Sequence, residues 1–166
     1  MIRERTPADD EAIRRLNDVA FGGPYESQLV RELRAAELAM IELVAVEEKA
    51  IVGHILFSQL AVTLGDGRIK ALSLAPVSVR PDRQRRGIGG GLVRRGLDLA
   101  SEHGWQAVVV VGHPNYYPRF GFSVALARPL KAQFSGDAFM ALELEPGALQ
   151  GGVGRVVYPS PFGITS

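Results

Sequence analysis

The chain contains no cysteine among its 166 residues, and its cations and anions nearly balance, with a formal net charge of +1. The lack of cysteine excludes disulfide bonds, thiolate–metal sites and a cysteine nucleophile, and is compatible with a cytoplasmic protein. A near-zero net charge does not indicate a general affinity for nucleic acid. No apolar run approaches the roughly 18 residues of a membrane-spanning helix. A length of 166 residues favours a single globular domain over residues 1–166. The absences lead us to expect no bound metal, no membrane span and no nucleic-acid partner.

The first half of the chain indicates helices followed by strands. Thr6-Pro7, followed by two aspartates, is typical of a helix start, and Gly22-Gly23-Pro24 ends that helix. A second helix begins near Glu26. Alternating or continuous apolar runs then predict a three-strand antiparallel meander. The strands expected in this half are 2–5, 43–46, 51–57 and 69–79.

The second half adds a helix between two parallel strands. Residues 88–103 carry apolar and charged side chains on opposite halves of the helical circle, which is typical of a helix lying on a sheet. Residues 107–111 are wholly apolar and predict a buried strand parallel to 69–79. A short helix over 114–119 and late strands at 138–144 and 155–158 follow. The fold class is therefore predicted as α/β with a mixed sheet.

Glycines and arginines crowd the segment from Gln84 to Gly91, where a strand passes into a helix. A helix N-terminus offers unpaired N–H donors, glycines allow an anion to approach them, and arginines add charge-assisted hydrogen bonds. The glycine spacing fits neither a P-loop nor a dinucleotide fingerprint. The alternative is a structural role, in which these glycines only permit close packing of the helix on the sheet. The arginine cluster favours the anion site.

The pattern Gln84-x-x-Gly87-x-Gly89 resembles the pyrophosphate motif of the GNAT superfamily of acyl-CoA N-acyltransferases. A second segment, 115–122, is similar to a later motif of that family, in which a tyrosine stands four residues before the glycine of a Gly-Phe pair. Tyr117 has that spacing from Gly121. The order of elements also agrees, to about residue 144. The Phe-Gly-Phe form resembles a bacterial subgroup whose acceptors are mostly unassigned.

The resemblance implies a mixed, mostly antiparallel twisted sheet flanked by helices, with a parallel strand pair that splays at the CoA site. It also implies acetyl-CoA as cosubstrate and direct transfer of the acetyl group to a primary amine. In the family, main-chain groups of the splayed strand and of the loop hold the cosubstrate. The positions that correspond here are Val77, Val79, Gln84, Arg85, Arg86, Gly87, Ile88, Gly89 and Gly90.

Tyr117 is the expected general acid, because a phenol can protonate the departing thiolate. Tyr116 is its direct rival, since adjacent helical side chains point about 100° apart and only one is expected to face the sulfur. The base is less defined. The resemblance places Glu26 in the acceptor-binding region, while His54, His113 and ordered water are the alternatives.

Two other function classes compete with the enzyme. A CoA-binding regulatory domain would keep the loop from Gln84 to Gly91 and dispense with turnover, and Tyr117 argues against it. A nucleic-acid-binding domain would use the arginine cluster, which lacks interleaved aromatic residues. The acceptor is expected to be a small-molecule or peptide amine, and the sequence leaves open whether the chain forms a homodimer.

Overall fold

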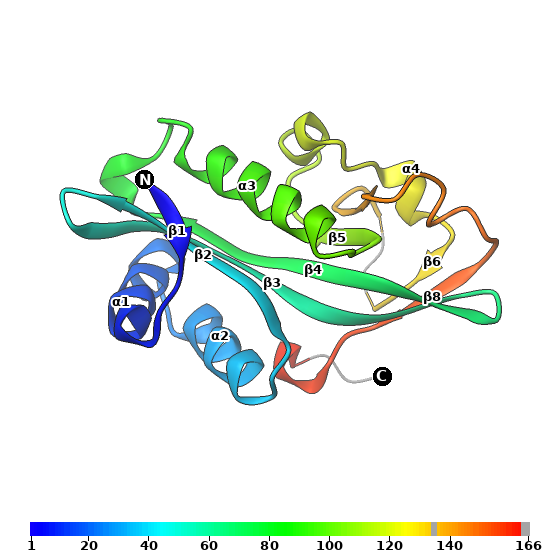
Figure 1. The fold of residues 1–166 in the computed structure, drawn as a ribbon, viewed down its shortest axis with the longest axis horizontal. Coiled ribbons are helices and arrows are strands. Elements are labelled where there is room, and N and C mark those ends of the chain that lie inside the picture. Colours follow the sequence, from blue (N-terminus) through cyan, green and yellow to red (C-terminus); the bar gives the residue numbers. More distant parts are fainter. Residues whose placement is uncertain (134–135, 164–166) are drawn as a thin grey trace. The chain divides into compact units, whose positions relative to one another are not determined.

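The computed structural model, drawn in Figure 1, describes residues 1–133 and 136–163. The chain groups into two compact units. The first unit comprises Met1–Ser58 and Ala75–Leu99, and the second comprises Gln59–Leu74 and Ala100–Ser166. Strands β3 (Ala50–Leu64) and β4 (Gly67–Val79) each contribute residues to both units. No helix within the described residues is long and apolar enough to cross a membrane.

In the first unit, β1 (Ile2–Glu4), β2 (Ala39–Glu47) and β3 pair antiparallel. Glu48 and Lys49 connect β2 to β3 with positive φ angles of 50° and 65°, as a tight hairpin turn requires. The side chains on both faces of β3 are buried from Val52 to Ser58. This strand is therefore covered on both sides, which explains its nearly continuous apolar sequence.

Helices cover both faces of these strands. Figure 1 shows α1 (Asp10–Phe21) and α2 (Tyr25–Ala35) on one face of β1, β2 and β3, and α3 (Ile88–Glu102) on the other. A Cβ added at Gly96 of α3 would lie 2.2 Å from the Phe57 ring, so this glycine permits the close approach of α3 to β3. A short 3-10 turn, η1 (Pro7–Asp9), precedes α1, and another, η2 (Pro81–Arg83), follows β4.

The second unit holds the parallel pair. Strand β4 pairs with β5 (Ala107–Val111) in parallel, and β5 pairs antiparallel with β7 (Phe139–Glu143). Strand β8 (Gly154–Val157) pairs antiparallel with β3 and parallel with the two-residue β6 (Leu130–Lys131). The remaining helices are η3 (Tyr117–Phe120), α4 (Val124–Ala127) and η4 (Ser160–Phe162).

The predicted order of elements and the mixed α/β class are confirmed, including the parallel β4–β5 pair. Helix α3 buries its predicted apolar side, with Leu92 and Val93 fully covered. The sequence prediction missed the second half of β3, from Ser58 to Leu64, and also missed α4 and β6. Those two elements are four and two residues long, too short for periodicity to show.

Candidate functional site

The segment between β4 and α3 forms an open backbone loop. Gln84 is extended, and its side-chain amide donates a 3.1 Å hydrogen bond to the Val79 carbonyl, which ties the loop to the end of β4. Arg85 and Gly87 both adopt left-handed φ angles, of 67° and 81°. A Cβ at Gly87 would meet nothing within 4 Å, so glycine serves the backbone conformation there and not the packing. Left-handed residues alternating with residues of negative φ turn successive N–H groups toward one concave side of the loop. This is a known anion-binding geometry.

The N–H groups of this loop have no acceptor among residues 1–133 and 136–163. Within the described residues, no backbone amide from Arg85 to Gly90 donates a hydrogen bond, and the first bond of α3 runs from Gly91 N to Gly87 O at 2.9 Å. The N-terminus of a helix also carries about half a positive charge. The start of α3 therefore presents a run of free donors in a positive field.

Ion pairs divide the arginine cluster into two groups. Arg80 is paired with Asp82 at 2.6 Å, and Arg83 is paired with Glu47 at 3.0 Å and with Asp82 at 2.8 Å. Arg85 and Arg86 are exposed and have no ion-pair partner among the described residues. The two cations available to an anion at the loop are thus Arg85 and Arg86, the two assigned to it from the resemblance.

Val77 and Val79, the two strand residues assigned to the cosubstrate, lie near the end of β4. Both are half-buried, while Pro76 and Ser78 between and beside them are buried. This alternation places Val77 and Val79 on the more accessible side of the strand. Pro76 has no N–H and cannot donate to a neighbouring strand.

Tyr117, the predicted acid, is the first residue of η3 in the second unit and is only 8% exposed. Its ring packs against Gly112 so closely that a Cβ there would lie 2.4 Å from the ring edge. Phe122 meets it edge to face, at 5.8 Å between ring centroids. The phenol is therefore held in a fixed aromatic setting that requires glycine at position 112.

Burial, with a smaller contribution from Tyr116, raises the pKa of the Tyr117 phenol to about 12. The hydroxyl consequently stays protonated over the whole physiological range and is a hydrogen-bond donor there. No described residue accepts a hydrogen bond from it. An anionic atom placed next to this hydroxyl would therefore meet a ready donor.

Tyr116 has a different environment from its neighbour. It is half-buried, the Arg119 guanidinium lies 4.5 Å from its ring centroid, and its main-chain carbonyl accepts a 2.9 Å bond from Arg119 Nε. It also contacts Phe120 edge to face. Tyr116 thus packs within η3, and the choice of Tyr117 over Tyr116 as the acid stays a prediction.

The three side chains that are candidates for the base differ in exposure and in hydrogen bonding. His54 is fully buried: its Nε2 lies 2.7 Å from Glu42 Oε2 and its Nδ1 lies 3.2 Å from Asn17 Nδ2, so no substrate can reach it. His113 is exposed, and its carbonyl accepts hydrogen bonds from the two following tyrosine amides. Glu26 is half-buried in the first turn of α2 and has no hydrogen bond or ion pair among the described residues.

His54 belongs to a buried polar network in the first unit. Glu42 accepts from His54 and from Arg34, and Arg34 also lies 3.3 Å from Asp10. Burial acts to raise the pKa of Glu42, but the hydrogen bonds from His54 and Arg34 outweigh it and lower the pKa to about 2. The network joins α1, α2, β2 and β3, and its role is structural.

Comparisons with known proteins agree with this geometry. A family profile described as "Acetyltransferase (GNAT) domain" matches residues 1–125. An uncharacterized N-acetyltransferase of Escherichia coli, YhbS, is 33% identical over 165 residues, or 98% of each chain. The crystal structure of YhbS in complex with CoA covers 100% of this chain and 93% of its own, with a TM-score of 0.90 and 31% identity. A GNAT acetyltransferase from Brucella melitensis, crystallised with acetyl-CoA, covers 98% and 97% with a TM-score of 0.81 and 34% identity.

Proposed function

Because the chain belongs to the GNAT family of N-acetyltransferases, we propose that it transfers the acetyl group of acetyl-CoA to a primary amine by direct attack. The observation that carries the proposal is the loop from Arg85 to Gly90, where six consecutive amides and two arginines have no partner in the described part of the chain. The relatives from E. coli and B. melitensis were crystallised with CoA and acetyl-CoA, which supports the same cosubstrate here.

The diphosphate of CoA is the group that the loop would hold. Its oxygens would accept from the free amides of Gly87, Ile88, Gly89 and Gly90, while Arg85 and Arg86 supply the charge. Gln84, which the resemblance also assigns to the cosubstrate, donates its side-chain amide to the Val79 carbonyl. Its part is to fix the loop against β4.

The end of β4 would hold the arm that carries the thioester. The residues of β4 that pair with β5 end at Ser73, and β4 continues beyond them through Val77 and Val79. In a splayed parallel pair, main-chain N–H and C=O groups at these positions are open to hydrogen bonds. Their partners would be the amides of the pantetheine arm of CoA and the thioester carbonyl at its end. An N–H there would stabilise the negative charge that develops on the carbonyl oxygen.

Transfer needs the neutral amine, whose nitrogen attacks the thioester carbon. A C–N bond forms and the C–S bond breaks, so that the sulfur leaves with the electron pair. The Tyr117 hydroxyl donates to this sulfur, and the proton lost by the nitrogen passes to water or to Glu26. A phenol with a pKa of about 12 is a weaker acid than a thiol, whose pKa is about 8.5. Tyr117 would therefore act mainly by hydrogen bonding to the sulfur as it departs.

Acetyl-CoA binding is the first test. A ligand at 100 times its Kd stabilises the folded state by about 2.7 kcal/mol, which corresponds to roughly 5–10 °C in melting temperature for a chain of this length. Millimolar acetyl-CoA should produce such a shift. The absence of any shift in folded protein would contradict the proposal.

The second test is a screen of candidate amine acceptors in which the release of free thiol from acetyl-CoA is measured. The set should span small polyamines, amino acids, aminoglycosides and peptides with free N-termini. Acceptor-dependent thiol release, with the acetylated amine identified by mass spectrometry, is the expected result. Tight acetyl-CoA binding without acceptor-dependent release across the set would favour the regulatory domain instead.

A further inference from the structure

Four side chains of alternating charge link the end of β2 to η2, the corner that follows β4. Arg83 Nε donates to Glu47 Oε1 at 3.0 Å, and Arg83 Nη1 donates to Asp82 Oδ2 at 2.8 Å. Asp82 also accepts from Arg80 Nε at 2.6 Å. Glu47 is the last residue of β2 and stands 36 positions before Arg83, so the four residues, here named the η2 network, join two separate elements of the first unit.

Arg83 is the member of the η2 network that stands nearest to the loop in sequence. Its side chain is 22% exposed, whereas Arg85 and Arg86 are fully exposed residues of the loop. Two of its nitrogens are already bonded to carboxylates, and an incoming anion would have to compete with both. Arg83 therefore differs from the two arginines that follow it, because its charge is used within the protein.

The loop needs support from outside, because its own amides do not fix its conformation. No amide from Arg85 to Gly90 donates a hydrogen bond to a described residue. Main-chain bonds hold only the corner before it, from Arg80 N to Val52 O at 2.7 Å and from Arg83 N to Arg80 O at 2.8 Å. Without the side-chain contacts of Arg83, this corner would sample more conformations, and ordering the loop on binding would cost more conformational entropy.

We propose that Arg83 is a positioning residue for CoA binding, held by Glu47 and Asp82 so that the loop Arg85–Gly90 keeps the conformation that receives the diphosphate. Arg83 acts through the loop and does not touch CoA. The proposal rests on the proposed function, because it takes the CoA diphosphate as the ligand of the loop. The rival role for Arg83 is a direct contact with a phosphate.

Removing Glu47 separates the two roles by the sign of its effect. Glu47→Ala releases Arg83 from one of its two carboxylates and removes a negative charge, so a direct phosphate contact predicts tighter acetyl-CoA binding. The positioning role predicts the opposite: Glu47→Ala and Arg83→Ala should each weaken binding by about 3- to 10-fold. Combining the two changes should weaken it no further than Arg83→Ala alone, because the two residues act as one pair.

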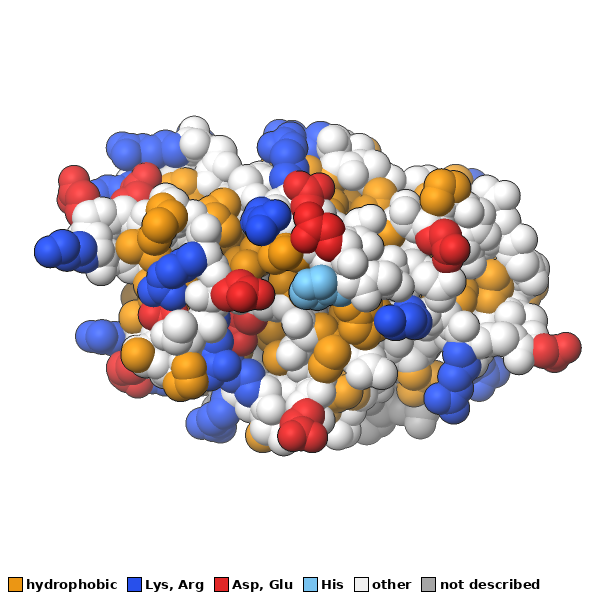
Figure 2. Space-filling model, viewed as in Figure 1, with side chains coloured by type: hydrophobic (Ala, Val, Ile, Leu, Met, Phe, Trp, Pro, Cys, Tyr) orange, Lys and Arg blue, Asp and Glu red, His pale blue; other side chains and the backbone are white. Residues whose placement is uncertain are grey.

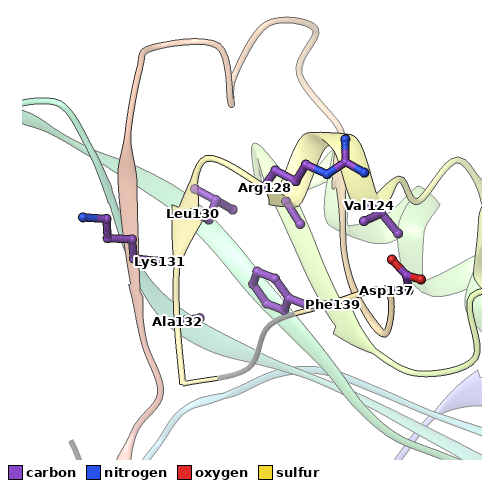
Figure 3. Close-up of a pocket in the computed structure, with 9 residues that line it drawn as sticks. Val124, Arg128, Leu130, Lys131, Ala132, Asp137 and Phe139 are labelled. Atoms are coloured by element: carbon purple, nitrogen blue, oxygen red, sulfur yellow. The ribbon is translucent and has the colours of Figure 1, made fainter.

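The measurement is a calorimetric titration of the whole chain with acetyl-CoA. Glu48→Ala is the matched control for Glu47→Ala, because it removes the same charge one position later and its side chain makes no hydrogen bond or ion pair with a described residue. Lys131→Ala is the control for the lost positive charge of Arg83→Ala, since Lys131, labelled in Figure 3, lies in β6 of the second unit. Both controls should keep the wild-type affinity.

Kinetics and proteolysis add readouts that a general loss of stability would not produce. With an acceptor from the amine screen, KM for acetyl-CoA should rise in Glu47→Ala and Arg83→Ala while kcat stays at the wild-type value. Without any ligand, trypsin should cut after the exposed Arg85 and Arg86 faster in these two variants than in wild type and Glu48→Ala. Circular dichroism checks that each variant is folded, and mass spectrometry identifies each cut.

The proteolysis also lets the two proposals fail separately. If cleavage follows the expected order but the wild-type chain does not bind acetyl-CoA, the proposed function is contradicted and the hold of Arg83 on the loop stands. Tighter or unchanged acetyl-CoA binding by folded Glu47→Ala would overturn the positioning role of Arg83, as would unchanged cleavage of the loop in that variant.

Discussion

Tyr116 and Tyr117 are adjacent in sequence, yet their environments differ. Tyr117 is packed on Gly112 with a raised pKa, whereas Tyr116 is stacked with Arg119. The spacing to Gly121 singles out Tyr117 from the sequence alone, because that motif is local, and its catalytic role stays a prediction. Which arginines are free was not predictable in this way: the partner of Arg83 is Glu47, 36 residues away, and only the folded chain brings them together.

Replacing Tyr117 with phenylalanine removes the hydroxyl and retains the ring that packs on Gly112. If the hydroxyl stabilises the departing thiolate by a hydrogen bond, kcat should fall by about 10²-fold, the scale of losing one hydrogen-bond donor to a developing negative charge. KM for acetyl-CoA should change little. Tyr116→Phe is the matched control and should be much milder. Steady-state kinetics with an acceptor from the screen would measure both, and a larger loss in Tyr116→Phe would assign the role to the other tyrosine.

The strand–loop–helix segment β4–α3 is the element that the sequence predicted best. Its helix shows a clear apolar side, its strand is apolar, and the glycines and arginines stand at the junction. The prediction did not foresee the left-handed conformation of Arg85, a residue type that rarely adopts it. Nor did it foresee the bond from Gln84 to Val79, because both depend on how the loop turns in space.

An aspartate at position 89 tests this element. A carboxylate in the first turn of α3 is favourable to the helix itself, because it lies at the positive end, so Gly89→Asp should fold. It would repel the CoA diphosphate, and like-charge contacts cost several kcal/mol, so affinity should drop by about 100-fold or more. Gly23→Asp is the control, since it adds the same charge in open space between α1 and α2. Equal CoA affinity in the two variants would place the diphosphate elsewhere.

At the scale of the whole chain, sequence order and local pattern were sufficient for the fold class, and they were not sufficient for the long-range contacts. The short strands β6 and β8 pair in parallel, although 22 residues lie between Lys131 and Gly154 in the sequence. No local pattern indicates this contact. The division of contacts into two units was likewise not visible in the sequence. Figure 2 shows charged side chains of both signs interspersed over the face it displays, in keeping with the balanced composition.

The buried network around Glu42 has the same origin. His54 stands opposite Val44 in the β2–β3 register and Glu42 stands opposite Leu56, so the pair is diagonal on neighbouring strands. Asn17 and Arg34 reach them from α1 and α2. The sequence around His54 does not indicate these partners, because they lie on other elements. Only the strand register shows that the histidine is buried against Glu42.

Acid should lower the free energy of unfolding through this network. The folded-state pKa of Glu42 is about 2, below its ordinary value of 4.5, so its contribution to stability is complete above about pH 4.5 and is lost as the pH falls toward 2. The contribution is on the order of 3 kcal/mol, since each pKa unit corresponds to about 1.4 kcal/mol. Urea unfolding measured from pH 7 to pH 2.5 would follow this loss.

Glu42→Gln separates this effect from that of the other carboxylates. At pH 7 the variant should be less stable than wild type by about 3 kcal/mol, because Arg34 loses a buried partner. The difference should shrink between pH 4.5 and pH 2, as protonation of Glu42 makes the wild type resemble the variant. Glu11→Gln, which removes an exposed carboxylate paired with Arg14 on α1, is the control and should leave the pH dependence nearly unchanged. A constant difference between Glu42→Gln and wild type across this range would show that Glu42 does not titrate as the network requires.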